Sequence, residues 1–484
     1  MEHVTEKLAD FALRARFGDL PQEVVNKVKQ ILLDSVGCAL GAYVTDRARL
    51  AVKFADERGG NPQASIIGGH RTSYDLAAFV NGELINTLDY DVIGPCTGHV
   101  YPYVAPPCLA IAERVHASGK DLILALALAQ EIGGRMASSL TQHRILKDEP
   151  PYYEEYPRFS FSTTLLGGVA GAGNLLGFDV NKMTNALGIA GASCPVPATQ
   201  KWETITGPAV MCKYNAWSGW CSQLGTVAAL MADDGFTGDT TILDGERGFW
   251  ALIGSPFFKP EKLLGGLGEV WRILESAIKL YPTCQINHAG IQALHRIIQE
   301  HNITPGEIQE IVIKGDPLYL TPNRGGTKVT NFGDMQFLNG YIFAAAVLYD
   351  DLAGPAWQMP AIFNRSELKT LAERVKVELH PRTSEVLANA IKTGTGRPFI
   401  MNVIVEVTAR GEKFAAEETA PKGAPANPAT EAEIQAKFRN NASFSMIRSS
   451  RVEEIIQMTG QLDEVDDISK FTRLLTLSNL GSKV

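Results

Sequence analysis

The sequence predicts a mainly α-helical protein, with a large all-helical domain built from both chain ends and a smaller α+β domain. Three observations lead to this prediction. Apolar residues recur at helical spacing over roughly the first 260 residues, and strand-like alternation begins only after Gly268. Helical spacing then returns after the Pro- and Gly-containing segment 421–428. We therefore expect residues 1–265 and 430–484 to form the helical domain and residues 266–429 the α+β domain.

The expected helices of the first part combine an apolar face with many Ala and Gly residues. In residues 4–17, Leu8, Phe11, Ala12 and Ala15 lie on one face of a helix. The other helices expected in this part span residues 21–33, 74–87, 106–116, 122–136, 163–176, 180–191 and 213–233.

The central part mixes the two periodicities, which is typical of an α+β domain. Strands are expected at residues 308–314, 375–379 and 401–408, and the last of these should turn at Arg410-Gly411 into a hairpin with residues 412–416. Helices are expected at 289–300, 337–349 and 366–375, and in the C-terminal segment at 431–440, 452–458 and 467–475.

Composition excludes several classes of protein. The 484 residues carry a net charge of −8, so there is no basic excess for nucleic-acid phosphates. The most apolar stretches, 122–129 and 163–178, are shorter than the roughly 20 residues that span a bilayer. Seven Cys without a CxxC pair favour reduced thiols, and the N-terminus lacks the apolar core of a secretory signal. We expect a cytoplasmic protein with no nucleic-acid or membrane partner.

Specific cofactor motifs are absent from the sequence. There is no HExxH, paired CxxC, GxSxG or P-loop, and no three-cysteine constellation for an iron–sulfur cluster. Gly171, Gly173 and Gly177 imitate a dinucleotide fingerprint, but no strand precedes them. They favour a close helix–helix contact instead. We therefore predict neither a metal nor a cofactor.

Residues 86–99, NTLDYDVIGPCTGH, are the densest candidate for chemistry. A helix end that runs into a loop can bring Asp89 to His99, so that a carboxylate orients an imidazole for acid/base catalysis. A helix C-terminus with solvated acids and a capping histidine fits the pattern equally well. An Asp-x-Asp metal site, with Asp89 and Asp91 as ligands, is a third reading that no further ligand cluster supports.

Two further segments contain candidate substrate-binding residues. Lys213 stands in the apolar stretch VMCKYN, where a desolvated lysine can hold a carboxylate or transfer a proton, although a snorkelling surface lysine is the ordinary interpretation. Residues 279–288, KLYPTCQINH, surround a proline turn at the expected domain junction, and clefts between domains are common ligand sites. The candidate substrate-binding residues there and beyond are Lys279, Tyr281, Cys284, His288 and Tyr341. Buried structural roles remain open for Cys284 and His288, and Tyr341 is ordinarily a core residue.

Six segments in a shared order carry a family resemblance: LLDSVGCALGA, AAFVNGELINTLDYD, GHVYPYVAPPCLAIAE, MCKYNAWSGWCSQLG, KLYPTCQINHAGIQAL and AKFRNNAS. They resemble the MmgE/PrpD family, which includes 2-methylcitrate dehydratases, cis-aconitate decarboxylases and iminodisuccinate epimerase. The resemblance implies the same two-domain fold, an active site between the domains, a homodimer and no cofactor.

The resemblance also implies roles for individual residues. Asp89 matches the first acid of the family's DFDD-like motif, and His99 the histidine of its HPS-like motif. Lys213 and Lys279 match the family's two lysines, the second of them in a K-x-x-P segment. Ser160 stands where epimerase and decarboxylase relatives typically carry a histidine. Cys284 likewise replaces a histidine of the decarboxylases.

The function expected from this resemblance is a cofactor-independent lyase similar to 2-methylcitrate dehydratase, which eliminates water from a small anionic polycarboxylate. Asp89 and His99 would be the acid/base pair, and Lys213 and Lys279 the cations that hold carboxylates. The alternatives are an epimerase, a decarboxylase, or a non-catalytic small-molecule-binding protein on the same fold. Convergence of Asp89, His99 and Lys213 in the structure would favour an enzyme over the binding protein.

Overall fold

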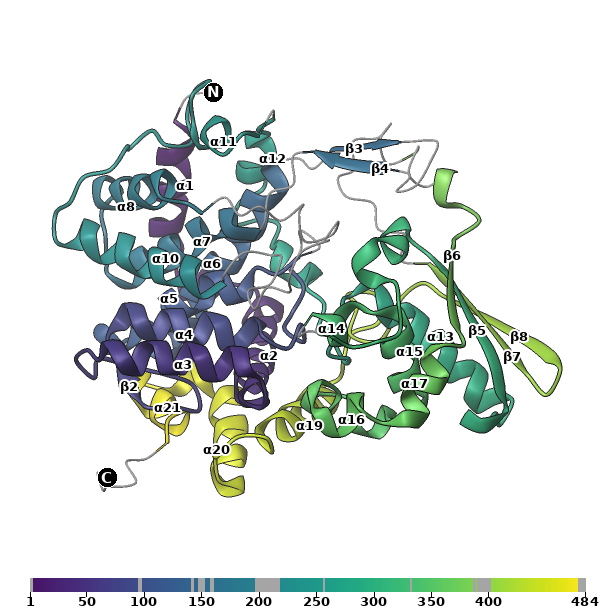
Figure 1. The fold of residues 1–484 in the computed structure, drawn as a ribbon. Helices are drawn as coiled ribbons and strands as arrows, with labels where there is room; N and C mark the ends of the chain where they lie inside the picture. Colours follow the sequence, from purple (N-terminus) through teal and green to yellow (C-terminus); the bar gives the residue numbers. More distant parts are fainter. Residues whose placement is uncertain are drawn as a thin grey trace.

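The computed structural model describes residues 3–94, 98–140, 143–146, 153–156, 161–195, 218–255, 257–330, 333–385, 389 and 402–477. Its buried apolar side chains form two large clusters, one in the helical part of the molecule and one in the part that contains the four-stranded sheet. Figure 1 shows the two parts side by side. The predicted fold class is therefore confirmed.

The helical part contains most of the helices of the chain. The longer ones are α1 (Val4–Arg14), α2 (Gln22–Gly41), α3 (Asp46–Arg58), α4 (Tyr74–Asn86), α5 (Tyr101–Arg114), α6 (Gly119–Ser139), α7 (Leu165–Leu175), α8 (Val180–Ala192) and α10 (Ser218–Asp233). Short helices α11 (Phe249–Leu252) and α12 (Pro260–Leu264) follow. Helix α3 was not expected from the sequence, and neither were the two-stranded pairs β1 (Ala64–Ser65) with β2 (Arg71–Thr72) and β3 (His143–Leu146) with β4 (Tyr153–Tyr156).

Helices α6 and α7 approach each other closely through glycine. A Cβ on Gly167 would lie 2.2 Å from the Ala129 carbonyl oxygen, and one on Gly171 would lie 2.6 Å from the Ala125 carbonyl oxygen. The glycines that imitate a nucleotide fingerprint thus include a residue at a helix–helix contact, as the sequence predicted.

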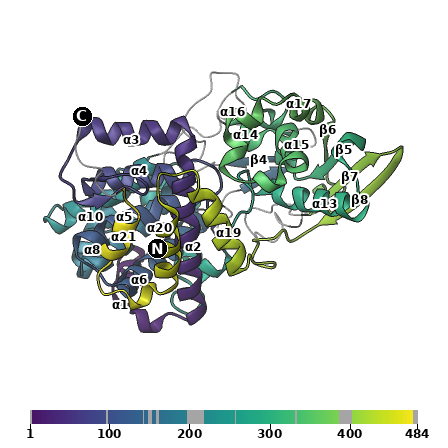
Figure 2. The same cartoon turned by 90° about the horizontal axis from the view of Figure 1, so that it is seen from below.

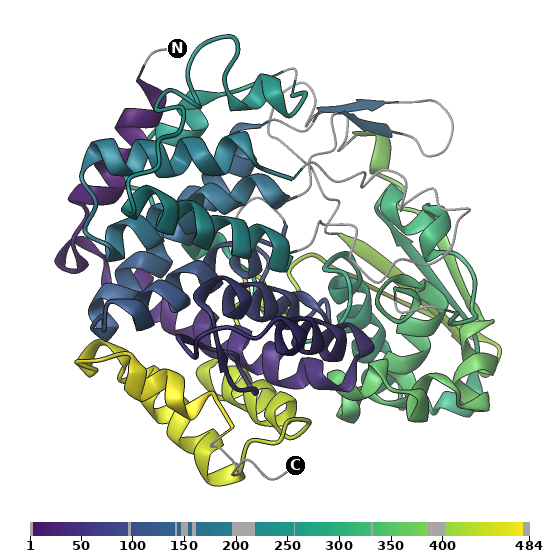
Figure 3. The same cartoon turned by 60° about the vertical axis from the view of Figure 1, so that its left-hand side comes forward.

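The C-terminal helices α19 (Glu431–Ala442), α20 (Ser449–Gly460) and α21 (Ser469–Leu474) contribute to the core of the helical part. Ile434 and Phe438 of α19 are fully buried, and the Phe438 ring lies 3.0 Å from the Cβ position of Gly37 in α2. Figures 2 and 3 show the yellow C-terminal segment against the purple and blue N-terminal helices. Both chain ends therefore build the same core, while the boundaries at residues 265 and 430 stay a prediction.

The second part is built on a mixed sheet with strand order β6-β5-β7-β8. Its strands are β5 (Ile308–Gly315), β6 (Val375–Leu379), β7 (Val403–Ala409) and β8 (Glu412–Glu418); β5 pairs with β6 in parallel, and the other pairs are antiparallel. The β7–β8 hairpin turns at Arg410 and Gly411, both at positive φ. Alternate residues of β7 are buried. The helices of this part are α13 (Ile286–Glu300), α14 (Asp334–Phe337), α15 (Asn339–Leu348), α16 (Pro360–Phe363) and α17 (Ser366–Ala372).

No helix within the described ranges combines the length and the apolar character that crossing a membrane requires.

Candidate active site

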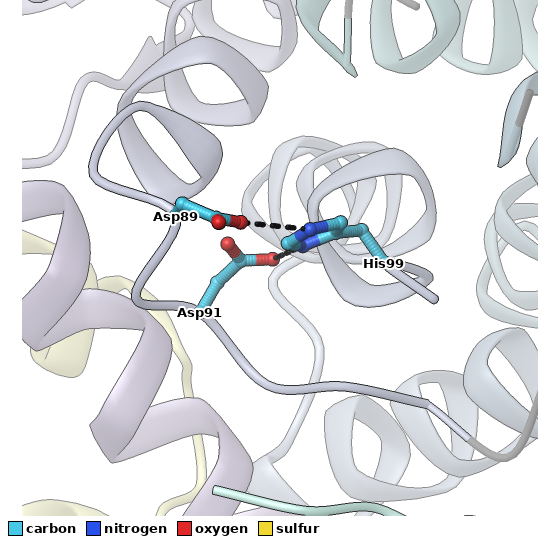
Figure 4. Close-up of side chains that lie close together, drawn as sticks. All are labelled: Asp89, Asp91 and His99. Atoms are coloured by element: carbon cyan, nitrogen blue, oxygen red, sulfur yellow. Dashed lines mark hydrogen bonds and ion pairs between the residues drawn. The ribbon is translucent and has the colours of Figure 1, made fainter. Parts of the chain in front are cut away.

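Asp89 and Asp91 lie in the loop that follows α4, and His99 lies just before α5. The loop begins with a turn in which the Asp89 N–H donates to the Asn86 carbonyl at 3.2 Å, and Asp89 itself has φ 53°. This left-handed conformation is uncommon outside glycine and is best tolerated by Asn and Asp. Figure 4 shows the two carboxylates pointing toward the His99 ring from one side of the site.

The His99 imidazole contacts a carboxylate at each ring nitrogen. Its Nε2 lies 3.0 Å from Asp89 Oδ1, and its Nδ1 lies 2.7 Å from Asp91 Oδ2. The Asn86 amide donates to Asp91 Oδ1 at 3.2 Å and so supports the second contact. The Asn86 Nδ2 also lies 3.1 Å from His99 Nδ1. An imidazolium, with a proton on each nitrogen, can donate to both carboxylates in this geometry. The pairing of Asp89 with His99 that the sequence predicts is therefore present.

Lys279 joins this cluster from the segment that connects the two parts of the molecule. Ile93 and Ala277 form an antiparallel bridge, which places the segment beside the loop after α4. The Lys279 Nζ then donates to Asp89 Oδ1 at 2.9 Å and to the Asp89 carbonyl at 2.8 Å. Lys279, Asp89, Asp91 and His99 are all buried, with at most 3% of each residue exposed. The Lys279 ammonium offsets one of the two buried carboxylates, and a protonated His99 would offset the other.

Asp89, Asp91 and His99 are also close enough together to bind one metal ion, since one potential ligand atom from each lies within 4.8 Å of the others. A ligating histidine directs one ring nitrogen at the metal and the other at a second-shell acceptor. Here both nitrogens contact carboxylate oxygens. The arrangement fits a hydrogen-bonded imidazolium between two acids better than a metal centre.

His288 is a second histidine near the cluster, and it is neutral. Burial, and then the positive charge of Lys279, lower the pKa of His288 to about 3. Its ring meets the Tyr281 ring edge-on, with 5.5 Å between centroids, and the Tyr281 hydroxyl lies 3.3 Å from His295 Nδ1. His288 is therefore a buried histidine that its surroundings keep neutral at physiological pH.

Cys284 and Tyr341, two other candidates from the sequence, lie in different surroundings. The Cys284 sulfur accepts a hydrogen bond from Arg324 Nη2 at 3.3 Å, and Arg324 is buried with its guanidinium 5.2 Å from the Phe337 ring centroid. Tyr341 is fully buried in the second core, where its hydroxyl donates to the Trp357 carbonyl. Its substrate-binding role stays a prediction that this contact does not favour. Lys213 and Ser160 lie outside the described residues.

Sequence reasoning missed a second buried ion pair beside the cluster. Lys437 of α19 contacts Asp34 of α2 at 2.6 Å and donates to the carbonyls of Tyr90 at 2.7 Å and Lys279 at 2.9 Å. Burial raises the pKa of Asp34, and the Lys437 charge acts against that rise. The charged Asp34 inside the apolar stretch ILLDSV was the available signal, whereas Lys437 lies in the largely polar segment AKFRNNAS and gave none.

Comparisons with known proteins identify the family of the chain. Residues 6–260 match the model of the MmgE/PrpD N-terminal domain, and residues 281–464 match that of the MmgE/PrpD C-terminal domain. The chain belongs to the MmgE/PrpD family. The predicted resemblance is thus confirmed, and the C-terminal family match includes α19 and α20, which pack on the helical part.

Three relatives of this MmgE/PrpD protein, each aligned over 98% of the chain, are named cis-aconitate decarboxylase or cis-aconitate decarboxylase-like protein. The chain is 25% identical to the cis-aconitate decarboxylase of Mus musculus, over 98% of this chain and 94% of the mouse protein. It is 24% identical to that of Homo sapiens, over 98% and 95% of the two chains. It is also 24% identical to the cis-aconitate decarboxylase-like protein oryM of Aspergillus oryzae, over 98% and 97%.

Proposed function

We propose that the protein is a cofactor-independent lyase that eliminates water from a small polycarboxylate by acid/base catalysis. The observation that carries this proposal is the chain of contacts from Lys279 through Asp89 to His99. The Asp89 carboxylate, which is the base in this proposal, lies 2.9 Å from the Lys279 ammonium and 3.0 Å from the His99 imidazole, which is the acid. Such elimination needs a base for the proton next to a carboxylate and an acid for the departing hydroxyl.

Asp89 is the base in this proposal and His99 is the acid. Asp89 takes the proton from the carbon next to a substrate carboxylate, and the electron pair left behind forms the new double bond. The C–O bond breaks as the His99 Nε2 proton passes to the hydroxyl, which leaves as water. Asp91 holds the other ring nitrogen at 2.7 Å and balances the imidazolium before the transfer. Because the cluster is buried, its charges act with little screening by water.

Lys279 stabilises the negative charge that develops on the substrate. Its Nζ contacts Asp89 Oδ1 in the free enzyme, and this contact weakens once Asp89 is protonated. The freed ammonium is then available to an enolate-like oxygen. Lys213 would supply a further cation for a substrate carboxylate, as the family resemblance implies.

Decarboxylation of cis-aconitate is the second candidate. The mouse and human relatives are aligned over 98% of this chain, and both are named cis-aconitate decarboxylase, which favours this reaction. Cys284 opposes it, since this position carries a histidine in decarboxylases and here holds a thiol bonded to Arg324. Epimerisation would use the same acid/base pair without loss of a group.

Product analysis distinguishes these reactions. We would incubate the purified protein with citrate, 2-methylcitrate, cis-aconitate or iminodisuccinate and follow each by proton NMR and by release of carbon dioxide. Water elimination gives a new alkene without carbon dioxide, seen as a vinyl proton or, for the fully substituted double bond formed from 2-methylcitrate, as a methyl singlet on the double bond. Decarboxylation of cis-aconitate gives new vinyl signals together with carbon dioxide. The His99→Gln variant is the matched control for background activity. If the wild type converts none of the four, the lyase proposal is rejected in favour of a binding protein, which calorimetry with the same compounds would reveal.

A further inference from the structure

The loop after α4 receives hydrogen bonds from buried side chains at four consecutive backbone carbonyls, residues 87–90. Gln336 Nε2 donates to the Thr87 carbonyl at 2.8 Å, and Gln358 Nε2 donates to the Leu88 carbonyl at 2.7 Å. Both glutamines come from the second part of the molecule, at the ends of α14 and of the 3₁₀ turn Pro355–Gln358. At most 4% of either residue is exposed.

The next two carbonyls of the loop accept from lysines. Lys279 donates to the Asp89 carbonyl, and Lys437 of α19 donates to the Tyr90 carbonyl. A buried backbone carbonyl outside a helix or sheet needs another hydrogen-bond donor. Each carbonyl from 87 to 90 is therefore satisfied by a residue distant in sequence.

These bonds hold a backbone that would not adopt its conformation unaided. Asp89 is in the left-handed region at φ 53°, and such residues persist only where the surroundings determine them. The glutamine amides also bond each other at 3.0 Å, so they act as one unit. The backbone carbonyl of Gln336 accepts from Thr283 Oγ1 at 2.8 Å, which ties the end of α14 to the segment that carries Lys279.

We propose that Gln336 and Gln358 are positioning residues that set the loop carrying Asp89 and Asp91 from across the interface between the two parts. Neither amide contacts the acid/base cluster directly; each acts through the backbone of residues 87 and 88. Their loss should therefore disturb the geometry of the proton transfers rather than the binding of substrate. This inference rests on the proposed function for its kinetic consequence, whereas its structural consequence can be measured without a substrate.

The test is the double variant Gln336→Met/Gln358→Met, which removes both amides and so leaves no single amide buried without its partner. We expect kcat to fall about 10- to 100-fold, because displacement of a reacting group by about 1 Å is enough for such a loss, while KM changes little. Hydrogen exchange of the peptide spanning residues 85–94 should become faster. If the double variant does not fold, Gln358→Met alone is expected to show both effects more weakly.

Asn81→Leu is the matched control. It removes a buried amide of α4 that also bonds backbone groups, the Ser65 carbonyl and the Ile67 N–H, without contacting the loop. Wild-type kcat and wild-type exchange of residues 85–94 in a folded glutamine variant would overturn the proposal. The proposal would also be overturned if Asn81→Leu lost as much kcat as the glutamine variant for the same change in melting temperature. A loss of kcat in the glutamine variant without faster exchange of residues 85–94 would overturn it too. Absence of activity in the wild type would reject the proposed lyase function alone, since the exchange measurement would still decide the positioning role.

Discussion

His99 is a fully enclosed side chain with an acid on each side, and this location decides how its variants will behave. Only 3% of the residue is exposed. A histidine in an exposed glycine-containing loop would contribute little to stability. His99 differs, because removing its ring leaves two buried carboxylates facing a void.

We predict that His99→Ala lowers kcat by about 10²–10⁴-fold, the usual contribution of a positioned acid/base group. Its melting temperature should fall as well, for the reason just given. His99→Gln fills part of the space and keeps one amide donor, so it should lose as much activity with a smaller loss of stability. Steady-state kinetics and thermal melts of both variants check this. Near-wild-type turnover in His99→Gln would remove the histidine from the mechanism.

His288 predicts a specific pH dependence of stability. Its pKa is about 3 in the folded protein against an ordinary 6.5, so the unfolded chain takes up the proton first as the pH falls. The contribution of neutral His288 to stability is therefore complete above about pH 6.5 and declines between pH 6.5 and 3. Urea unfolding at pH 7.5, 6 and 5 should show a steeper decline for the wild type than for His288→Gln. Parallel curves for the two proteins would contradict the buried neutral state.

Among the elements, α6 and α7 depend on the absence of side chains at their contact. Gly167 and Gly171 face backbone atoms of α6 at distances that no Cβ tolerates. The small residues in 163–178 predicted a close helix–helix contact. Only the structure showed that the partner helix is α6.

We predict that Gly171→Ala destabilises the protein by about 1–3 kcal/mol, because the new methyl would lie 2.6 Å from both the Ala125 carbonyl and the Cys108 sulfur. Gly460→Ala at the end of α20 is the control, since nothing lies within 4 Å of its Cβ position. Its free energy of unfolding should change little or rise slightly. An unchanged free energy of unfolding in Gly171→Ala, or an equal loss in both variants, would contradict the role of the helix contact.

On the scale of the whole molecule, the acid/base cluster depends on segments from the entire chain. The loop after α4 supplies Asp89, the connecting segment supplies Lys279, and α19 supplies Lys437. Truncation at the linker near residue 428 would therefore remove a direct contact to the site, in addition to part of the helical core.

Activity, once found, is predicted to survive chelation. The His99 nitrogens are both engaged by carboxylates, and this geometry leaves a metal no imidazole ligand without rearrangement. Turnover before and after prolonged incubation with a chelator measures this. Reproducible loss of turnover that one divalent metal restores would count against the proposed mechanism.

The predicted homodimer is tested by light scattering coupled to gel filtration, which should give the mass of two chains. A mass of one chain at micromolar concentration would contradict it.

The sequence by itself determined which of the predicted segments are helices and which are strands, because the spacing of apolar residues is a local property of the chain. Strand β6 matches its predicted bounds, the β7–β8 hairpin turns at the predicted Arg410-Gly411, and the pairing of Asp89 with His99 follows from one loop. Only the tertiary structure showed the rest. Lys437 and the two glutamines contact the loop across separations of more than 240 residues, and Asp34 is buried in α2 next to apolar residues of the same helix. No periodicity encodes such contacts, since they arise only when distant segments bury the same unsatisfied carbonyls and charges together.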